Sequence, residues 1–238
     1  MKAISELSIK LFADGAKVDE MKEAYRSGLV KGFTTNPTLM KKAGVTQYAA
    51  FAKEVLKEIT DLPISFEVFS DEFDEMEREA RIIASWGSNV NIKIPITNTR
   101  GESSVPLIRR LSQSGLSLNV TAMMTLEQVR MVSDALSPDT YNIVSIFAGR
   151  IADTGRDPVP HMKEAVSILK SKPKAELLWA SPRELLNIFQ AEECGCHIIT
   201  LLPDILKKLP IVGKDLTQYS LETVQMFYRD GQSVGFCI

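Results

Sequence analysis

Cysteine and histidine are scarce in this sequence, with three Cys and two His among 238 residues. Cys194, Cys196 and Cys237 are odd in number and lie late in the chain, which predicts thiols in a reducing cytoplasm rather than a disulfide framework. Cys194 and Cys196 beside His197 could suggest a metal. Residues of one strand alternate between its two faces, however, and the other histidine, His161, is far away in sequence. We therefore expect no metal site there.

The chain also lacks a charge excess of either sign and a long hydrophobic run. It has 28 Lys and Arg against 30 Asp and Glu, a net charge of -2, and no basic block, so no nucleic-acid partner is expected. No stretch approaches the roughly 20 apolar residues that span a bilayer, and Glu6 interrupts the place of an export signal. Without a Gly- or Ser-rich linker, residues 1–238 are expected to form a single domain.

Short apolar runs alternate with longer amphipathic segments along the chain. Helices are expected near 17–28, 37–42, 46–60, 71–86, 102–114, 125–137, 159–170 and 203–209, between eight predicted strands at 8–14, 32–37, 64–69, 89–95, 116–121, 141–147, 175–181 and 196–201. Eight such units predict the α/β fold of a (β/α)8 TIM barrel. An open doubly wound sheet is the competing fold, but no Gly-rich phosphate loop follows the first strand. A further helix at 215–229 would cover the barrel bottom or dock on a neighbouring subunit.

Polar side chains occur near the carboxyl ends of the predicted strands. In a barrel these ends meet at one mouth, where active sites lie. Taken one at a time, such residues could equally be helix caps or fill the pleat of a strand. Their convergence on one mouth points to a site instead: Asp14, Thr34, Asn36, Glu67, Lys93, Asn119, Thr121, Ser145, Arg150, Ser181 and Arg183.

Lys93 is the most informative of these residues because it lies in the apolar strand segment Ile92-Lys93-Ile94-Pro95. Lysine is rarely buried unless it is paired or takes part in chemistry. Burial disfavours the ammonium form, and a neutral amine attacks carbonyl carbons to give a Schiff base. The alternative is a lysine that reaches the barrel rim or pairs with Glu67.

A Schiff base on a sugar carbonyl acts as an electron sink, so that a neighbouring carbon-carbon bond can be broken or made. This chemistry needs a base for a hydroxyl proton and an acid for water at the imine carbon. Asp14 and Glu67 can divide these roles if their environments differ. Arg150 and Arg183 suit a phosphate on the substrate.

Five segments in this order resemble the transaldolase family, in the small-subunit branch that it shares with fructose-6-phosphate aldolase. The resemblance runs from about Ile9 to about Leu209 and rests on Phe33-Thr34-Thr35-Asn36-Pro37-Thr38-Leu39, Ile92-Lys93-Ile94-Pro95, Leu118-Asn119-Val120-Thr121, Ser145-Ile146-Phe147-Ala148-Gly149-Arg150 and Ala180-Ser181-Pro182-Arg183.

This resemblance implies a role for each matching residue. Lys93 would form the imine, and Asp14 would exchange the hydroxyl proton at the cleaved bond. Glu67 and Thr121 would position the water. Substrate would be held by Asn36, Thr34, Asn119, Ser145 and Phe147, and its phosphate by Arg150, Ser181 and Arg183.

Two positions favour transfer over simple cleavage. Family transaldolases tend to carry Glu and Phe where the aldolases carry Gln and Tyr, and this chain has Glu67 and Phe147. We expect a transaldolase that moves a dihydroxyacetone unit from fructose 6-phosphate or sedoheptulose 7-phosphate to an aldose phosphate. The alternatives are a lyase releasing free dihydroxyacetone, a related enzyme for a specialised sugar, and a barrel that has lost catalysis and serves in assembly. A specialised sugar is suggested by Pro182, which replaces an aromatic residue, and by the absence of an Asp-Thr pair at Asp14.

The resemblance also implies a setting for the enzyme. It implies no cofactor or metal, because the imine supplies the electron sink. Its partners would be small sugar phosphates of the pentose phosphate pathway, without nucleic acid or membrane. Family members of this size assemble as homo-oligomers, pentamers or decamers, and the segment 215–229 would reach a neighbour.

Overall fold

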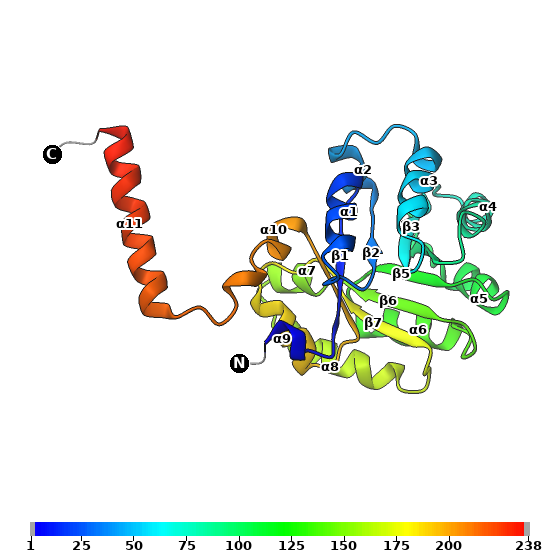
Figure 1. Ribbon diagram of the computed structural model, residues 1–238. Coiled ribbons are helices and arrows are strands. Elements are labelled where there is room, and N and C mark those ends of the chain that lie inside the picture. The colour runs from blue at the N-terminus through cyan, green and yellow to red at the C-terminus, as the bar shows by residue number, and fades with distance from the viewer. Residues whose placement is uncertain (1–2, 236–238) are drawn as a thin grey trace.

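A computed structural model describes residues 3–235 and shows a closed barrel of eight parallel strands (Figure 1). Each strand pairs with the next, and β8 pairs with β1. This last pairing closes the sheet, so the predicted (β/α)8 barrel is confirmed and the open sheet was wrong. The strands are β1 (Lys10–Asp14), β2 (Phe33–Thr34), β3 (Ile64–Glu67), β4 (Val90–Pro95), β5 (Leu118–Met123), β6 (Asn142–Ile146), β7 (Ala175–Trp179) and β8 (Ile198–Leu201).

Helices follow the strands and cover the outside of the barrel (Figure 1). They are α1 (Val18–Arg26), α2 (Pro37–Lys42), α3 (Tyr48–Glu58), α4 (Phe73–Ala84), α5 (Val105–Gln113), α6 (Leu126–Ala135), α7 (Ala148–Asp153), α8 (Pro158–Leu169), α9 (Leu186–Glu193), α10 (Pro203–Leu206) and α11 (Leu216–Val234). Short 3-10 turns occupy Ile4–Glu6 and Leu209–Ile211.

The structure corrects three local predictions. No helix was predicted over residues 148–153, which form α7, or where α9 lies. Both helices are short, and neither has the N-cap side-chain hydrogen bond that marks the start of the similarly short α2. Cys194 ends α9 and Gly195 has a φ of 77°, so Cys194 and Cys196 flank a tight turn rather than lying on one strand. Cys237 lies outside the described residues.

Apolar side chains fill the lower part of the barrel interior. Phe12, Ile143, Leu178 and Ile198 form a small buried cluster, separate from the larger core between strands and helices. Phe12 is fully buried, and a Cβ on Gly32 would lie only 2.4 Å from its ring. Each such side chain contributes about 1.5–3 kcal/mol by leaving water. The lower end is therefore filled, and the interior is polar only toward the carboxyl ends of the strands.

The helix expected at 215–229 is present, and it is longer than predicted. The Asp215 side chain accepts a hydrogen bond from the Gln218 amide at its start, and Gly235 ends it with a φ of 72°. In Figure 1, α11 stands away from the barrel, and none of residues 216–234 is buried. No helix of the described part of the chain is long and apolar enough to cross a membrane.

Candidate active site

A cavity of about 410 Å³ opens at the carboxyl ends of the barrel strands. Because parallel strands all end at this mouth, side chains from distant parts of the sequence meet there. The cavity is lined by every site residue predicted from the sequence except Arg183: Asp14, Thr34, Asn36, Glu67, Lys93, Asn119, Thr121, Ser145, Phe147, Arg150 and Ser181.

Lys93 lies on β4 and is only 6% exposed. Its Nζ is 3.0 Å from Glu67 Oε2, and it donates a hydrogen bond of 2.7 Å to the carbonyl oxygen of Thr35. The Glu67 pairing follows from the register, since Glu67 and Lys93 are direct partners on β3 and β4. The ion pair considered as an alternative is thus present, and both of its side chains also line the cavity.

Asp14 ends β1 on the same cavity, next to Thr34 of β2. Burial raises the pKa of the Asp14 carboxyl, because the charged form loses its hydration. The positive charge of Lys93 and a 2.8 Å hydrogen bond from Thr34 Oγ1 oppose this rise in pKa, while the negative charge of Glu67 adds to it. Asp14 is therefore a carboxyl group suited to accept and return a proton.

Asn119 is held by hydroxyl groups on both neighbouring sides. Its Nδ2 donates to Ser65 Oγ at 3.0 Å, and its Oδ1 accepts from Ser145 Oγ at 2.7 Å. These contacts determine which end of the amide faces which wall. Thr121 Oγ1 is buried and has no hydrogen-bond partner within residues 3–235, which leaves a hydroxyl able to hold water or substrate.

Asn36 has a structural role as well as a place on the cavity. It is the N-cap of α2, where its Oδ1 accepts a hydrogen bond from the Leu39 amide at 2.9 Å. Pro37 follows at the first helical position, where its missing N–H costs nothing. The Asn36 side chain is thereby oriented by the helix start, with its Nδ2 free of that contact.

The two predicted phosphate-binding arginines differ in position. Arg150 lines the cavity, and its guanidinium carbon lies 5.4 Å from the centre of the Phe147 ring. Arg183 does not line the cavity, because its guanidinium pairs with both carboxylate oxygens of Asp153 on α7. Ser181, which also lines the cavity, has a φ of 61°, a left-handed conformation that is uncommon for serine.

Sequence reasoning missed three residues that support this site. Thr35 acts through its backbone carbonyl, so its residue type gave no signal. Ser65 is the inward residue that orients Asn119. Thr200 on β8 lines the cavity with its hydroxyl 2.5 Å from that of Thr34. A polar residue near the end of an apolar strand was the available signal for Thr200.

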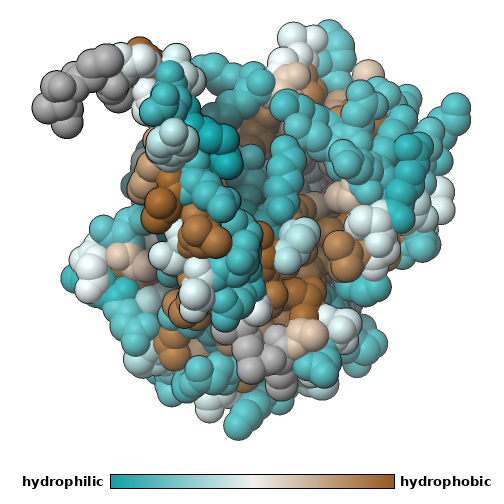
Figure 2. Space-filling model, turned by 60° about the vertical axis from the view of Figure 1, so that its left-hand side comes forward, coloured by the Kyte–Doolittle hydropathy of each residue, from teal (hydrophilic) through white to brown (hydrophobic). Residues whose placement is uncertain are grey.

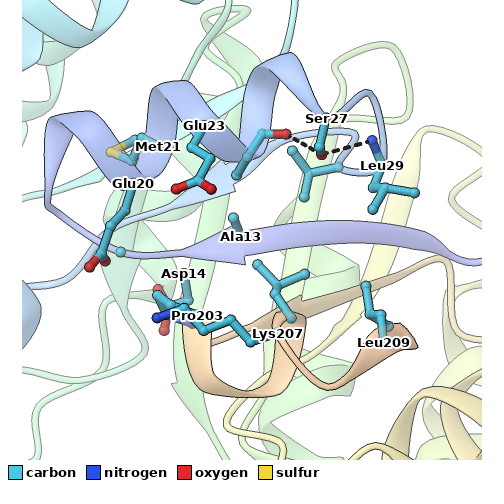
Figure 3. A pocket seen from close by; sticks show the side chains of 14 residues that line it. Ala13, Asp14, Glu20, Met21, Glu23, Ser27, Leu29, Pro203, Lys207 and Leu209 are labelled. Carbon is cyan, nitrogen blue, oxygen red and sulfur yellow. Dashed lines mark hydrogen bonds between the residues drawn. The ribbon is translucent and has the colours of Figure 1, made fainter. Parts of the chain in front are cut away.

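A second, smaller cavity of about 220 Å³ lies outside the barrel, between α1 and α10 (Figure 3). Apolar side chains form much of its wall, including Met21, Leu29 and Leu209. Glu20 and Lys207 add charges to its lining, and Asp14 borders this groove as well as the barrel cavity. Asp14 is therefore the residue that the two cavities share.

The fold and cavity define a (β/α)8-barrel enzyme with a buried lysine–carboxylate pair at the carboxyl ends of its strands. Solved structures with this fold include dihydrodipicolinate synthase from Rhodopseudomonas palustris, with a TM-score of 0.57 and 14% identity over 96% of this chain and 83% of that one. A 2,3-dimethylmalate lyase has a TM-score of 0.59 and 12% identity, over 98% of this chain and 86% of that one. At these identities the likeness concerns the fold.

Sequence comparison identifies the family. The model of the Transaldolase/Fructose-6-phosphate aldolase family matches residues 11–236. A probable transaldolase 2 of Listeria monocytogenes is 38% identical, covering 94% of this chain and all of the relative. A probable transaldolase of Thermoplasma volcanium is 36% identical over 95% of this chain and all of the relative. The chain belongs to the transaldolase/fructose-6-phosphate aldolase family and is an enzyme, as the sequence motifs predicted.

Proposed function

We propose that this protein is a transaldolase that transfers a dihydroxyacetone unit from a ketose phosphate to an aldose phosphate through a Schiff base on Lys93. The observation that carries this proposal is the position of Lys93, buried at the cavity wall with one carboxylate in contact and Asp14 at the same mouth. The donors would be fructose 6-phosphate or sedoheptulose 7-phosphate.

Imine formation begins when Lys93, in its neutral form, attacks the ketone carbon of the donor. Glu67 lies 3.0 Å from Nζ and can take up the proton that the amine loses. The carbinolamine then loses its hydroxyl group as water, which leaves a protonated imine. Glu67 and Thr121, whose hydroxyl has no hydrogen-bond partner among the described residues, would hold this water. The Thr35 carbonyl keeps Nζ directed within the site.

Bond cleavage depends on Asp14 in this proposal. Its carboxylate removes the proton from the hydroxyl group at the carbon beyond the three-carbon unit. The carbon-carbon bond breaks, an aldose phosphate leaves, and the electron pair moves into the imine to give an enamine. When an acceptor aldehyde enters, the enamine attacks its carbonyl carbon, and Asp14 returns the proton to the new hydroxyl group. Hydrolysis of the resulting imine releases the product and regenerates Lys93.

The cavity wall offers groups for the rest of the sugar. The amide groups of Asn36 and Asn119 would bind hydroxyl groups of the substrate, and Ser145 and Thr34 line the same cavity. Arg150 and Ser181 would bind the phosphate. Arg183 would bind the phosphate only if its ion pair with Asp153 breaks, since both hydrogen bonds to the Asp153 carboxylate hold its guanidinium against α7.

Phe147 favours transfer over release of free dihydroxyacetone. A phenol at this position could assist water in attacking the intermediate, whereas a phenyl ring offers no proton donor. Arg150 covers the ring of Phe147 at 5.4 Å. The enamine would therefore persist until an acceptor aldehyde arrives.

Borohydride trapping tests the imine. With fructose 6-phosphate present, mass spectrometry of the digested protein should find a three-carbon adduct on the Lys93 peptide. Lys93→Met should remove the adduct and the activity. The matched control Lys10→Met changes a lysine at the opposite end of the barrel, paired with Glu176, and should retain both. An unmodified Lys93 under turnover would refute the proposal, and a full reaction rate without acceptor aldehyde would identify a lyase.

We further propose that the enzyme works as a homo-oligomer, a pentamer or decamer, in which α11 packs on a neighbouring subunit. The helix exposes large apolar residues, including Leu216, Val224, Phe227 and Tyr228. Figure 2 brings the α11 side of the molecule forward and shows hydrophobic (brown) groups on it. Light scattering should report an oligomer that Phe227→Glu dissociates. A monomer at all concentrations would refute the assembly.

We also propose a cytoplasmic location and a role in the pentose phosphate pathway. The two buried free thiols, Cys194 and Cys196, support the location, and membership of the family supports the pathway.

A further inference from the structure

Thr200 ends a chain of hydroxyl groups that leads to Asp14. The distance between Thr200 Oγ1 and Thr34 Oγ1 is 2.5 Å, and Thr34 Oγ1 donates to Asp14 Oδ1 at 2.8 Å. Both threonines are almost completely buried, with 5% and 3% of their surface exposed. Thr200 is paired in register with Phe12 of β1, and Asp14 with Thr34 of β2. The three polar groups therefore meet where β8, β1 and β2 close the barrel.

The number of available protons determines the direction of the hydrogen bonds among Thr200, Thr34 and Asp14. An ionised carboxylate only accepts hydrogen bonds, and each hydroxyl group has a single proton to donate. While Asp14 is ionised, Thr34 must give its proton to Asp14, so Thr200 must donate to Thr34. Once Asp14 carries a proton on Oδ1, it can donate to Thr34, and Thr34 then donates to Thr200. The hydrogen bonds among Asp14, Thr34 and Thr200 can thus reverse without breaking, and the Thr200 hydroxyl proton is then free to turn toward the cavity that Thr200 lines.

We propose that Thr200 is a positioning residue that acts through Thr34. It supports the carboxylate form of Asp14, and it accepts a hydrogen bond from Thr34 when Asp14 is protonated. The inference rests on the proposed function, because it concerns the proton that Asp14 takes from the substrate hydroxyl group and later returns. Thr200 itself touches neither that proton nor the carbon-carbon bond. Through Thr34, it supports the hydrogen bond to Asp14 in both protonation states.

Other charges facing Asp14 act in both directions. Lys93, from β4, favours the carboxylate, whereas Glu67, from β3, and burial disfavour it. Glu20 and Lys207 line the groove on the outer side of Asp14 (Figure 3). The hydrogen bond from Thr34 also favours the carboxylate form of Asp14. Donation from Thr200 polarises the Thr34 hydroxyl and strengthens that bond, since linked hydrogen bonds reinforce one another.

The test is the pH dependence of kcat/KM in Thr200→Val, Thr200→Ala and Thr200→Ser. Loss of the hydroxyl should move the acid limb of the profile to higher pH, with kcat/KM about threefold lower on that limb and little changed on the plateau. Both Val and Ala should cause this shift, so a folding defect in one leaves the other to decide. Serine keeps the hydroxyl and should restore the wild-type profile.

Two controls separate the possible outcomes. Thr140→Val removes a half-buried hydroxyl group that donates to the Ser112 carbonyl at 3.1 Å, ahead of β6 and away from the cavity, and should leave the profile unchanged. Borohydride trapping with dihydroxyacetone should modify Lys93 in every Thr200 variant, because trapping requires no proton transfer by Asp14. An equal loss of kcat/KM at every pH, or no rescue by serine, would overturn the role of Thr200. Failure to trap the wild-type enzyme would instead refute the proposed function.

Discussion

Gly149→Ala should damage both the stability and the site of this enzyme. Gly149 lies in α7, and a Cβ at this position would be 1.5 Å from the carbonyl oxygen of Ser181 and 2.6 Å from its carbonyl carbon. Real Cβ atoms essentially never come closer than 3.0 Å to such neighbours. Either α7 or the turn after β7 must therefore move by about 1.5 Å. Because the obstacle is backbone, no side-chain rotation can relieve it.

The expected size of the effect follows from this displacement. Overpacking of a buried contact typically costs about 1–3 kcal/mol, and we expect the upper end. Separating the two segments also breaks the hydrogen bond from the Gly149 amide to the Ala180 carbonyl, now 3.3 Å, worth about 1 kcal/mol. Alanine's better helix propensity returns at most about 1 kcal/mol. A net loss of about 3 kcal/mol in the free energy of unfolding results.

Activity should fall as well, because Arg150, which follows Gly149 directly, and Ser181 both line the cavity. Misplacement of a binding group by about 1 Å can lower a rate about 10²-fold. Urea unfolding followed by circular dichroism, together with kcat/KM for fructose 6-phosphate, measures both effects.

Gly231→Ala provides the matched control. Gly231 lies within α11 with open space around its Cβ position, so the same substitution should stabilise the protein there by up to about 1 kcal/mol. If Gly149→Ala matched the wild-type enzyme in unfolding free energy and in kcat/KM, the close approach of α7 to Ser181 would not be a requirement of the fold.

Three further predictions concern single side chains of the cavity. Asp14→Asn should abolish transfer yet raise the melting temperature near pH 7. Burial raises the pKa of Asp14 in the folded state, so the unfolded chain loses this proton at a lower pH. The wild-type protein therefore loses stability as the pH rises from the unfolded-state pKa to the folded-state pKa. Thermal scans should show the difference vanishing at about pH 3, and a constant difference would contradict this. Thr121→Val should change the free energy of unfolding by no more than about 1 kcal/mol, since the Thr121 hydroxyl has no partner in the described chain. It should lower kcat about 10²-fold, because the water of imine formation is no longer held. An unchanged kcat would exclude this role of Thr121 in holding water. Arg150→Leu should raise KM about 10- to 100-fold for phosphorylated donors and hardly for dihydroxyacetone, and equal effects on both would argue against phosphate binding.

Much of the fold was predictable because its signals are local. Each strand is a short apolar run, and amphipathic segments of ten residues or more showed a helical period. The elements that were missed, α7 and α9, have six and eight residues. So short a segment is held by its neighbours, as Gly149 is by Ser181, more than by its own periodicity.

The candidate site was predictable to the extent that it depends on residue type at strand ends. Lys93, Asp14 and Glu67 could be assigned to one mouth because all strands of a parallel barrel end there. The family motifs then supplied an expected role for each of them. Neither the motifs nor the strand pattern could show that Arg183 pairs with Asp153 instead of lining the cavity.

The family, the barrel fold and most of the polar groups at its mouth followed from the amino-acid sequence, although Thr200 was missed and Arg183 does not line the cavity. How these groups contact one another depends on the folded chain. The Thr35 carbonyl that holds Lys93 is a backbone atom present in every residue, so no side chain announces it. Thr200 and Thr34 are 166 residues apart and meet only because β8 pairs with β1 to close the barrel. Hydrogen bonds depend on distances of a few tenths of an ångström, and only the folded chain determines distances at that scale.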